Sequence, residues 1–180
     1  MPSGLVSIAS TLIVGFGIRY KSHRWAWIVA CCIPGMIGGG LMSFSPKNNR
    51  AALLAGIYLV NFIVATLTVI YHWTVANCAG QTKRVTAVAI IAGSFSIGNI
   101  IGPQTFQARD APEYRPAKIT VMATQAAAAL VAFLLFLYYV WANRRKDQKE
   151  AMLPSENPDE IAESWGNKTD KEKRSFRYVY

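Results

Sequence analysis

Acidic residues are missing from most of this sequence. The chain has 180 residues and ten Asp and Glu, and the first of these is Asp110. A water-facing surface normally mixes charges of both signs, so such a long acid-free stretch excludes an ordinary soluble domain. Because 52% of the residues are hydrophobic and only 16% are charged, the sequence predicts a membrane protein.

Histidine and cysteine are also scarce. The two histidines are His23 and His72, and the three cysteines are Cys31, Cys32 and Cys78, with no C-x-x-C spacing. Zinc sites and disulfide frameworks need clustered ligands or paired cysteines. Proton-transfer catalysis needs placed carboxylates or histidines, and the apolar part of the chain contains no carboxylate. The sequence therefore predicts no enzyme, no bound metal and no cofactor.

Long uncharged runs are what the sequence does contain. A bilayer core about 30 Å thick needs roughly 20 helical residues. Five runs qualify as membrane-spanning helices and give an all-α membrane protein, at residues 4–18, 25–44, 51–72, 85–106 and 119–141. The first run is short, so it is either a signal sequence or a shortened membrane helix. No Lys or Arg precedes it and no cleavage motif follows it, which favours the helix.

Basic residues between the runs predict the orientation. Nine of them fall on one side: Arg19, Lys21, Arg24, Lys83, Arg84, Arg144, Arg145, Lys146 and Lys149. Five fall on the other: Lys47, Arg50, Arg109, Arg115 and Lys118. By the positive-inside rule the richer side is cytoplasmic. Because these charges sit in short connections and not along one face, the partner they indicate is the lipid bilayer and not nucleic acid.

The end of the chain differs sharply from the rest. Residues 1–142 form the predicted transmembrane domain, and residues 143–180 alternate Lys, Glu, Asp, Asn, Ser and Pro. Such a composition buries too little apolar surface to offset chain entropy, so a disordered cytoplasmic tail is expected. Asn167 begins an N-x-T glycosylation motif, which stays unmodified if the tail is cytoplasmic.

The third run carries a polar stripe. Tyr58, Asn61, Ala65, Thr68 and His72 recur at helical spacing. An amide in hydrocarbon needs a polar partner, so Asn61 either forms an interhelical hydrogen bond or faces a water-filled route. The same two alternatives apply to three side chains of the fourth run and one of the fifth: Ser94, Ser96, Asn99 and Gln125.

Small residues and prolines mark helix contacts and irregularities. Gly35 and Gly39 form one G-x-x-x-G pair, and Gly98 and Gly102 form another. Such pairs let a neighbouring backbone approach closely, either in static packing or at a contact that slides or rocks. Two prolines within the runs, Pro34 and Pro103, predict kinks or helix ends because each removes a backbone donor.

Four segments, in order, resemble fungal allantoate permease-type transporters. They are residues 73–84 (WTVANCAGQTKR), 96–106 (SIGNIIGPQTF), 110–114 (DAPEY) and 170–178 (DKEKRSFRY), and the likeness extends over about residues 45–180. These transporters are anion:cation symporters of the major facilitator superfamily. The resemblance implies that the five helices correspond to helices eight to twelve of a twelve-helix carrier, with a cytoplasmic C-terminus in a fungal plasma membrane.

The resemblance also implies a function and its residues. Family members take up small organic anions or vitamin-like acids with protons, by alternating access between two halves. The residues expected to face the substrate are Tyr58, Asn61, Thr68, Asn99 and Gln104, and those expected to act in gating or topology are Lys83, Arg84, Gly98 and Gly102. On this hypothesis the chain is a truncated transporter that can be inactive alone. Its partner would be the missing N-terminal half or a full-length carrier.

A different class of function fits the same residues. The chain could be a non-transporting membrane partner that associates with a complete carrier through its Gly98 and Gly102 face. Co-purification with such a carrier would favour this alternative, whereas uptake by the isolated chain would favour transport.

Overall fold

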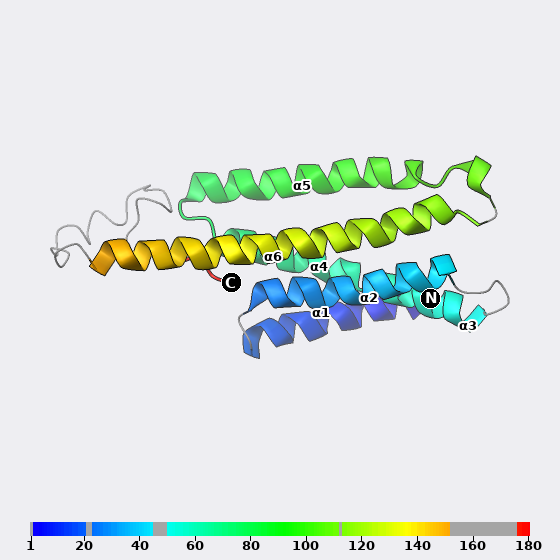
Figure 1. Ribbon diagram of the computed structural model, residues 1–180, viewed down its shortest axis with the longest axis horizontal. Helices are drawn as coiled ribbons and strands as arrows, with labels where there is room; N and C mark the ends of the chain where they lie inside the picture. The colour runs from blue at the N-terminus through cyan, green and yellow to red at the C-terminus, as the bar shows by residue number, and fades with distance from the viewer. Residues whose placement is uncertain (1, 21–22, 45–49, 112, 152–175) are drawn as a thin grey trace.

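The computed structural model describes residues 2–20, 23–44, 50–111, 113–151 and 176–180. Within these ranges the secondary structure is helical throughout, in six α-helices and one short 3₁₀ helix (Figure 1). They are α1 (Pro2–Tyr20), α2 (Arg24–Phe44), α3 (Arg50–Val60), α4 (Ile63–Ala76), α5 (Gln81–Gln104), η1 (Ala108–Asp110) and α6 (Arg115–Ala151). The predicted all-α class is confirmed.

Five stretches of the described residues are long and apolar enough to cross a membrane. They are Ser3–Tyr20, Arg24–Phe44, Arg50–Ala76, Gln81–Gln104 and Arg115–Lys149. The first is 18 residues long and reaches about 27 Å at 1.5 Å per residue, somewhat less than the roughly 20 residues that a bilayer core requires. Large apolar side chains point outward along these helices, as expected where lipid replaces water around the protein. The chain is a multi-pass membrane protein.

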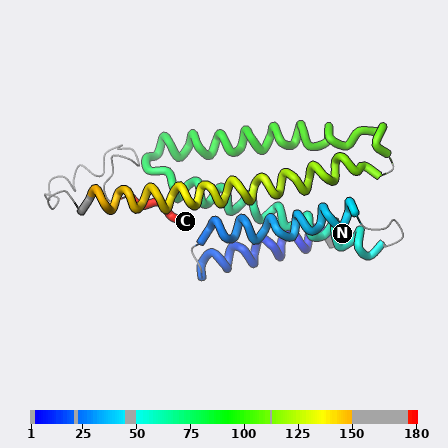
Figure 2. The backbone as a smooth tube through the Cα atoms, viewed as in Figure 1, coloured from blue at the N-terminus to red at the C-terminus, as the bar shows by residue number. Residues whose placement is uncertain are grey.

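Helix α2 is the centre of the bundle. It packs against α6 on one side and against α3 and α4 on the other (Figures 1 and 2). The buried hydrophobic residues of the central cluster come mainly from α2 and α4, with one each from α1 and α6: Val14, Ile28, Cys31, Cys32, Ala65, Val69, Trp73 and Ala132. Cys31 and Cys32 therefore act as small apolar core residues, as their position in an apolar run suggests.

Glycines allow α2 to approach both neighbours. A Cβ added to Gly38 would lie 2.7 Å from the carbonyl oxygen of Gly56 on α3. A Cβ on Gly39 would lie 3.3 Å from the Cβ of Met122 on α6. These distances leave no room for a side chain at Gly38 and little at Gly39, so α2 contacts its neighbours backbone to backbone.

The third predicted span is interrupted in its middle. Residues 61 and 62 separate α3 from α4, and backbone bonds there run from residue i to i−3: Asn61 to Tyr58, Phe62 to Leu59, Val64 to Asn61 and Ala65 to Phe62. No Gly or Pro occupies the break. Helix α2 continues on both sides of Pro34, so of the two predicted alternatives a helix end does not apply there. Pro103 lies one residue before the end of α5, where the prediction of a helix end is confirmed.

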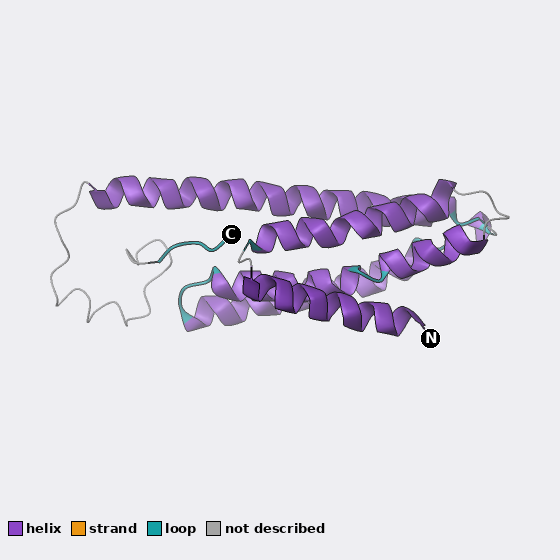
Figure 3. Cartoon of the chain, turned by 90° about the horizontal axis from the view of Figure 1, so that it is seen from below, coloured by secondary structure: helices purple, strands orange, loops and turns teal. Residues whose placement is uncertain are grey.

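Helix α6 extends well beyond the apolar run. It continues as helix to Ala151, and residues 176–180 return to pack beside it (Figure 3). The prediction of an unstructured tail from residue 143 is therefore wrong for residues 143–151 and 176–180. Residues 152–175, including Asn167, lie outside the described residues, and there the prediction stays a prediction.

Candidate functional site

The break between α3 and α4 holds the main predicted substrate residue. Asn61 lies in the break, and its side-chain amide donates to the carbonyl oxygen of Ile57 at 2.8 Å. The amide thus caps a carbonyl that the interruption leaves without its helical donor, so the observed bond is within the segment and not between helices. Tyr58 lies in the last turn of α3 and is half-buried, and Thr68 lies on α4 and is exposed.

The break sits at mid-depth of the bundle. It falls near the middle of the Arg50–Ala76 span, and Val60, immediately before it, lies against Gly38 of α2. One helical turn before Gly38, Gly35 faces the side chain of Gln125 on α6. Polar groups therefore occur at similar depth on two sides of α2.

Gln125 is a polar residue inside the packed interface. Its side chain is 5% exposed, and its Oε1 has no hydrogen-bond partner among the described residues. An unpaired buried amide oxygen costs about 1–3 kcal/mol, so native proteins rarely keep one without a use. The sequence pattern left two roles open for Gln125, an interhelical hydrogen bond or a place on a water-filled route. Its burial against α2 is a signal that the sequence does not contain.

Helix α5 stands apart from the substrate residues on α3 and α4. None of its residues is buried, and several of its polar side chains bond the backbone of their own helix, as Asn99 does to the carbonyl oxygen of Phe95 at 3.0 Å. Added Cβ atoms at Gly98 and Gly102 would meet nothing within 4 Å. Asn99 and Gln104 are thus exposed and are not brought together with Asn61 inside this chain, and the second glycine pair has no helix packed on it.

Two basic residues predicted to act in gating begin α5. Lys83 and Arg84 are exposed in its first turn, at the end of the bundle where α6 leaves its apolar part (Figure 1). Arg84 donates to the carbonyl oxygen of Cys78 in the preceding turn at 3.4 Å. This position at a helix end agrees with a role in topology or gating, but no contact with a ligand tests it.

The best-defined polar arrangement was not predicted. At the same end of the bundle the C-terminal segment, residues 176–180, is bound by two asparagines. Asn77 pairs with Val179 through both side-chain atoms: the Val179 amide donates to Oδ1 at 2.7 Å, and Nδ2 donates to the Val179 carbonyl oxygen at 3.0 Å. Asn143 pairs with Tyr178 in the same way, at 2.9 and 2.8 Å.

Further contacts fix the side chains of this C-terminal segment. The indole of Trp73 donates to the carbonyl oxygen of Val179 at 2.7 Å, and the Tyr178 ring stacks on Tyr139 with centroids 4.9 Å apart. Arg177 pairs with Asp147 at 2.8 Å. The segment thereby joins the end of α4 to α6. The resemblance had marked residues 176–178 as a motif, but not their partners.

These features define a helical membrane protein, and among its described residues no group of three or more His, Cys, Asp or Glu could hold a metal. Comparison with known proteins narrows the class. The chain is 34% identical over 99% of its length to an uncharacterized transporter of Schizosaccharomyces pombe, 30% identical over 100% to a thiamine pathway transporter of Saccharomyces cerevisiae, and 26% identical over 99% to the allantoate permease of Saccharomyces cerevisiae.

The chain spans about a third of the length of these curated relatives, 34% of each. No family model matches it. No solved structure matches it. Its relatives are nevertheless fungal transporters of the major facilitator type, which confirms the resemblance stated from the four motifs. These proteins are named transporters and permeases and not enzymes, in agreement with the non-enzymatic prediction.

Proposed function

We propose that this chain takes part in the transport of a small organic anion or vitamin-like acid, coupled to protons and operating by alternating access. The observation that carries the proposal is the similarity of the whole chain to fungal transporters, the allantoate permease among them. Carriers of this kind place substrate near the bilayer midplane, often at an interrupted helix. The α3–α4 break with Asn61 and Tyr58 has that position and supports the proposal.

The proposal gives the chain the part of helices eight to twelve in such a carrier. The remaining wall of the substrate cavity would then come from an N-terminal half or from a full-length carrier. Tyr58, Asn61 and Thr68 would face the substrate from α3 and α4, and Asn99 and Gln104 would join them only after α5 moves against the other helices. Gly98 and Gly102, with open space beside them, would allow that approach.

The proposed location is the plasma membrane, with the C-terminus in the cytoplasm. The excess of basic residues on the side of Lys83, Arg84 and Arg144 supports this orientation. The C-terminal segment would then join α4 and α6 on the cytoplasmic side, and its contacts would have to rearrange if these helices separate during the transport cycle.

Uptake by reconstituted protein tests the proposal. The purified chain is placed in liposomes, alone and together with a complete carrier of the same fungal family, and uptake of labelled allantoate is measured across an inward proton gradient. We expect uptake above that of the carrier alone, and we expect a protonophore to abolish it. Uptake that equals the carrier alone, with and without the gradient, would contradict a transport function.

A second candidate is a non-transporting membrane partner. The observation that favours it is the surface of α5, which has no buried residue and open space beside both glycines. In this case the chain would co-purify with a complete carrier, and Gly98→Leu would weaken the association without any change in uptake by the chain alone.

A further inference from the structure

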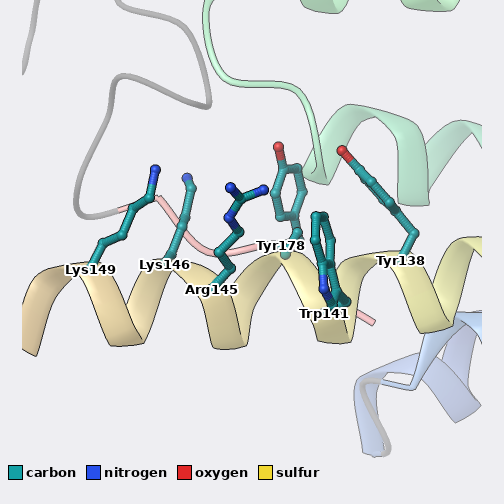
Figure 4. Close-up of a pocket in the computed structure, with 7 residues that line it drawn as sticks. Tyr138, Trp141, Arg145, Lys146, Lys149 and Tyr178 are labelled. Atoms are coloured by element: carbon teal, nitrogen blue, oxygen red, sulfur yellow. The ribbon is translucent and has the colours of Figure 1, made fainter.

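A cavity of about 450 Å³ lies against α6 where the helix leaves its apolar part (Figure 4). Six of its lining residues belong to α6 and one to the C-terminal segment: Tyr138, Trp141, Ala142, Arg145, Lys146, Lys149 and Tyr178. The six α6 residues follow the spacing i, i+3, i+4, i+7, i+8, i+11, which places them on one face of the helix. The cavity is therefore a continuous strip that passes from aromatic to basic.

The lining is positively charged. Arg145, Lys146 and Lys149 contribute three cations, and no acidic side chain lines the cavity among the described residues. The nearby carboxylate of Asp147 is paired with Arg177 at 2.8 Å and does not line the cavity. Among the described residues no acid lies in the cavity wall beside Arg145 and Lys149, which are both exposed, so the strip favours an anionic ligand.

Aromatic rings and the C-terminal segment hold two of the cations in place. The guanidinium of Arg145 lies 5.3 Å from the ring centre of Trp141. The ammonium of Lys146 donates to the carbonyl oxygen of Phe176 at 3.0 Å and lies 5.4 Å from the ring centre of Tyr178. Cation–π contacts of this kind restrict the side chain without removing its charge. Figure 4 shows the three basic side chains projecting to the same side of α6.

The depth of the strip matches the lipid headgroups. Trp141 closes the uncharged run of α6 and sits where tryptophans line the membrane interface. Arg145 follows four residues later, about 6 Å along the axis, and Lys149 about 12 Å. The polar layer of a leaflet is about 5–8 Å thick, so the backbone of Arg145 lies within the headgroup layer and that of Lys149 lies a few Å beyond it, from where its long side chain can reach back.

We propose that this cavity binds the headgroup of an anionic phospholipid. Arg145 and Lys149 would bind the phosphate groups, Lys146 and Tyr178 would form the wall toward the C-terminal segment, and Tyr138 and Trp141 would contact the glycerol and upper acyl region. A lipid is favoured over a soluble anion because the basic part continues directly into aromatic and apolar helix surface. The inference goes beyond the proposed transport function and depends only on α6 crossing the membrane.

Native mass spectrometry of the full chain in detergent tests this inference. Phosphatidylinositol 4-phosphate is the probe, and phosphatidylcholine is the zwitterionic reference. A hydrogen bond from a cation to a phosphate is worth about tenfold or more in affinity, so Arg145→Gln should lower affinity for the probe at least about tenfold and Arg145→Gln/Lys149→Gln at least about 100-fold. Arg145→Lys, which keeps the charge, should retain most of the binding.

Arg144→Gln is the matched control. Arg144 is the preceding residue on α6 and undergoes the same change of charge, but it does not line the cavity. Binding by this variant should fall by no more than about fivefold, since only the general attraction of one cation to an anionic lipid is lost. Equal losses in Arg144→Gln and Arg145→Gln would overturn the site, because they would show attraction to basic charge alone.

Two further results would also overturn the proposal. One is equal retention of phosphatidylinositol 4-phosphate and phosphatidylcholine by the unchanged chain. The other is displacement of the bound probe by inorganic phosphate at equal concentration, which would indicate a soluble-anion site and not a lipid site. Melting curves of all variants control for folding, and they should coincide because Arg145 and Lys149 are exposed.

Discussion

At the scale of single residues, Asn61 links the structure to the proposed transport. One N–H of its amide donates to the Ile57 carbonyl oxygen at the α3–α4 break, so the second N–H remains available to donate to an anionic ligand. We expect Asn61→Leu to lower kcat/KM for uptake about tenfold or more in the reconstitution described above, because a hydrogen bond to a charged group is worth about 1.5–3 kcal/mol. Initial uptake rates over a range of allantoate concentrations measure this.

Thr120→Val is the control for Asn61→Leu. Thr120 is an exposed residue of α6 whose hydroxyl bonds only the Pro116 carbonyl of its own helix at 2.8 Å. It should leave uptake unchanged. If Asn61→Leu reaches the membrane in normal amount and transports with unchanged kinetics, Asn61 is not a substrate residue.

Asn77 is the residue on which binding of the C-terminal segment most depends. We expect Asn77→Ala to lower the stability of the folded chain by about 1–3 kcal/mol, because the amide of Val179 would lose its acceptor and the carbonyl one of its two donors. Thermal unfolding in detergent measures the change. Release of the terminal residues by carboxypeptidase should also become faster.

Asn99→Ala serves as the comparison for Asn77→Ala. The Asn99 amide bonds only its own helix and is exposed, so its removal should change stability by less than about 0.5 kcal/mol. Equal unfolding temperatures for Asn77→Ala and the unchanged chain would show that the two Asn77–Val179 hydrogen bonds do not stabilise the fold.

At the scale of helices, two glycine pairs of identical spacing have different surroundings. A Cβ at Gly38, next to the pair on α2, would lie 2.7 Å from a backbone oxygen of α3, whereas one at Gly98 on α5 would meet nothing within 4 Å. We expect Gly38→Ala to destabilise the chain by about 1–3 kcal/mol through overpacking. Gly98→Ala should be neutral or stabilise α5 by up to about 1 kcal/mol, since Ala is the better helix former.

Thermal unfolding of the two glycine variants in the same detergent makes this comparison direct. Both substitutions add one methyl group to a helical glycine, so the difference between them reports packing alone. Similar unfolding temperatures for Gly38→Ala and Gly98→Ala would mean that α2 and α3 do not approach as closely as the Gly38–Gly56 contact requires.

The helices themselves could be predicted because charge and hydropathy decide which segments enter lipid. The uncharged runs locate all five spans, and the Gly35 and Gly39 pair does pack, against α6. The break at residues 61 and 62 could not be predicted, since neither residue is a Gly or Pro. The Asn61 side chain, which bonds the backbone at the break, could equally have formed an interhelical hydrogen bond. Propensity is a weak guide where packing decides the backbone.

The candidate site was less accessible to prediction for a related reason. Asn77 and Val179 are 102 residues apart, and no periodic pattern connects residues at such a separation. The burial of Gln125 likewise depends on which helix covers it. Residues such as Asn99 were assigned from the family resemblance, and the position of α5 in this chain neither brings them to Asn61 nor tests their role.

At the scale of the whole molecule, the arrangement is asymmetric. Helices α1, α2, α4 and α6 share one hydrophobic core, and α3 packs on α2. Helix α5 contributes no buried residue and runs along the outside of the bundle (Figure 2). An apolar helix in lipid needs no partner for stability, because hydrocarbon satisfies its surface. The position of α5 is therefore compatible with membrane insertion of the chain and leaves one face for association with further helices.

Orientation across the membrane is a property of the entire chain that can be measured directly. Arg109 and Arg144 lie near opposite ends of the bundle, and both are exposed; the Arg109 side chain is 78% exposed. With Cys78→Ser as background, we expect Arg109→Cys to react with a membrane-impermeant maleimide on intact spheroplasts, and Arg144→Cys only after permeabilisation. The reason is the count of nine basic residues against five, which retains the richer side in the cytoplasm. The buried Cys31 and Cys32 should stay unlabelled in both.

Asn167 should carry no glycan, since its motif would never enter the secretory lumen. Labelling of residue 144 on intact spheroplasts, or a glycan on Asn167, would reverse the orientation and place the basic cavity of α6 on the outer leaflet.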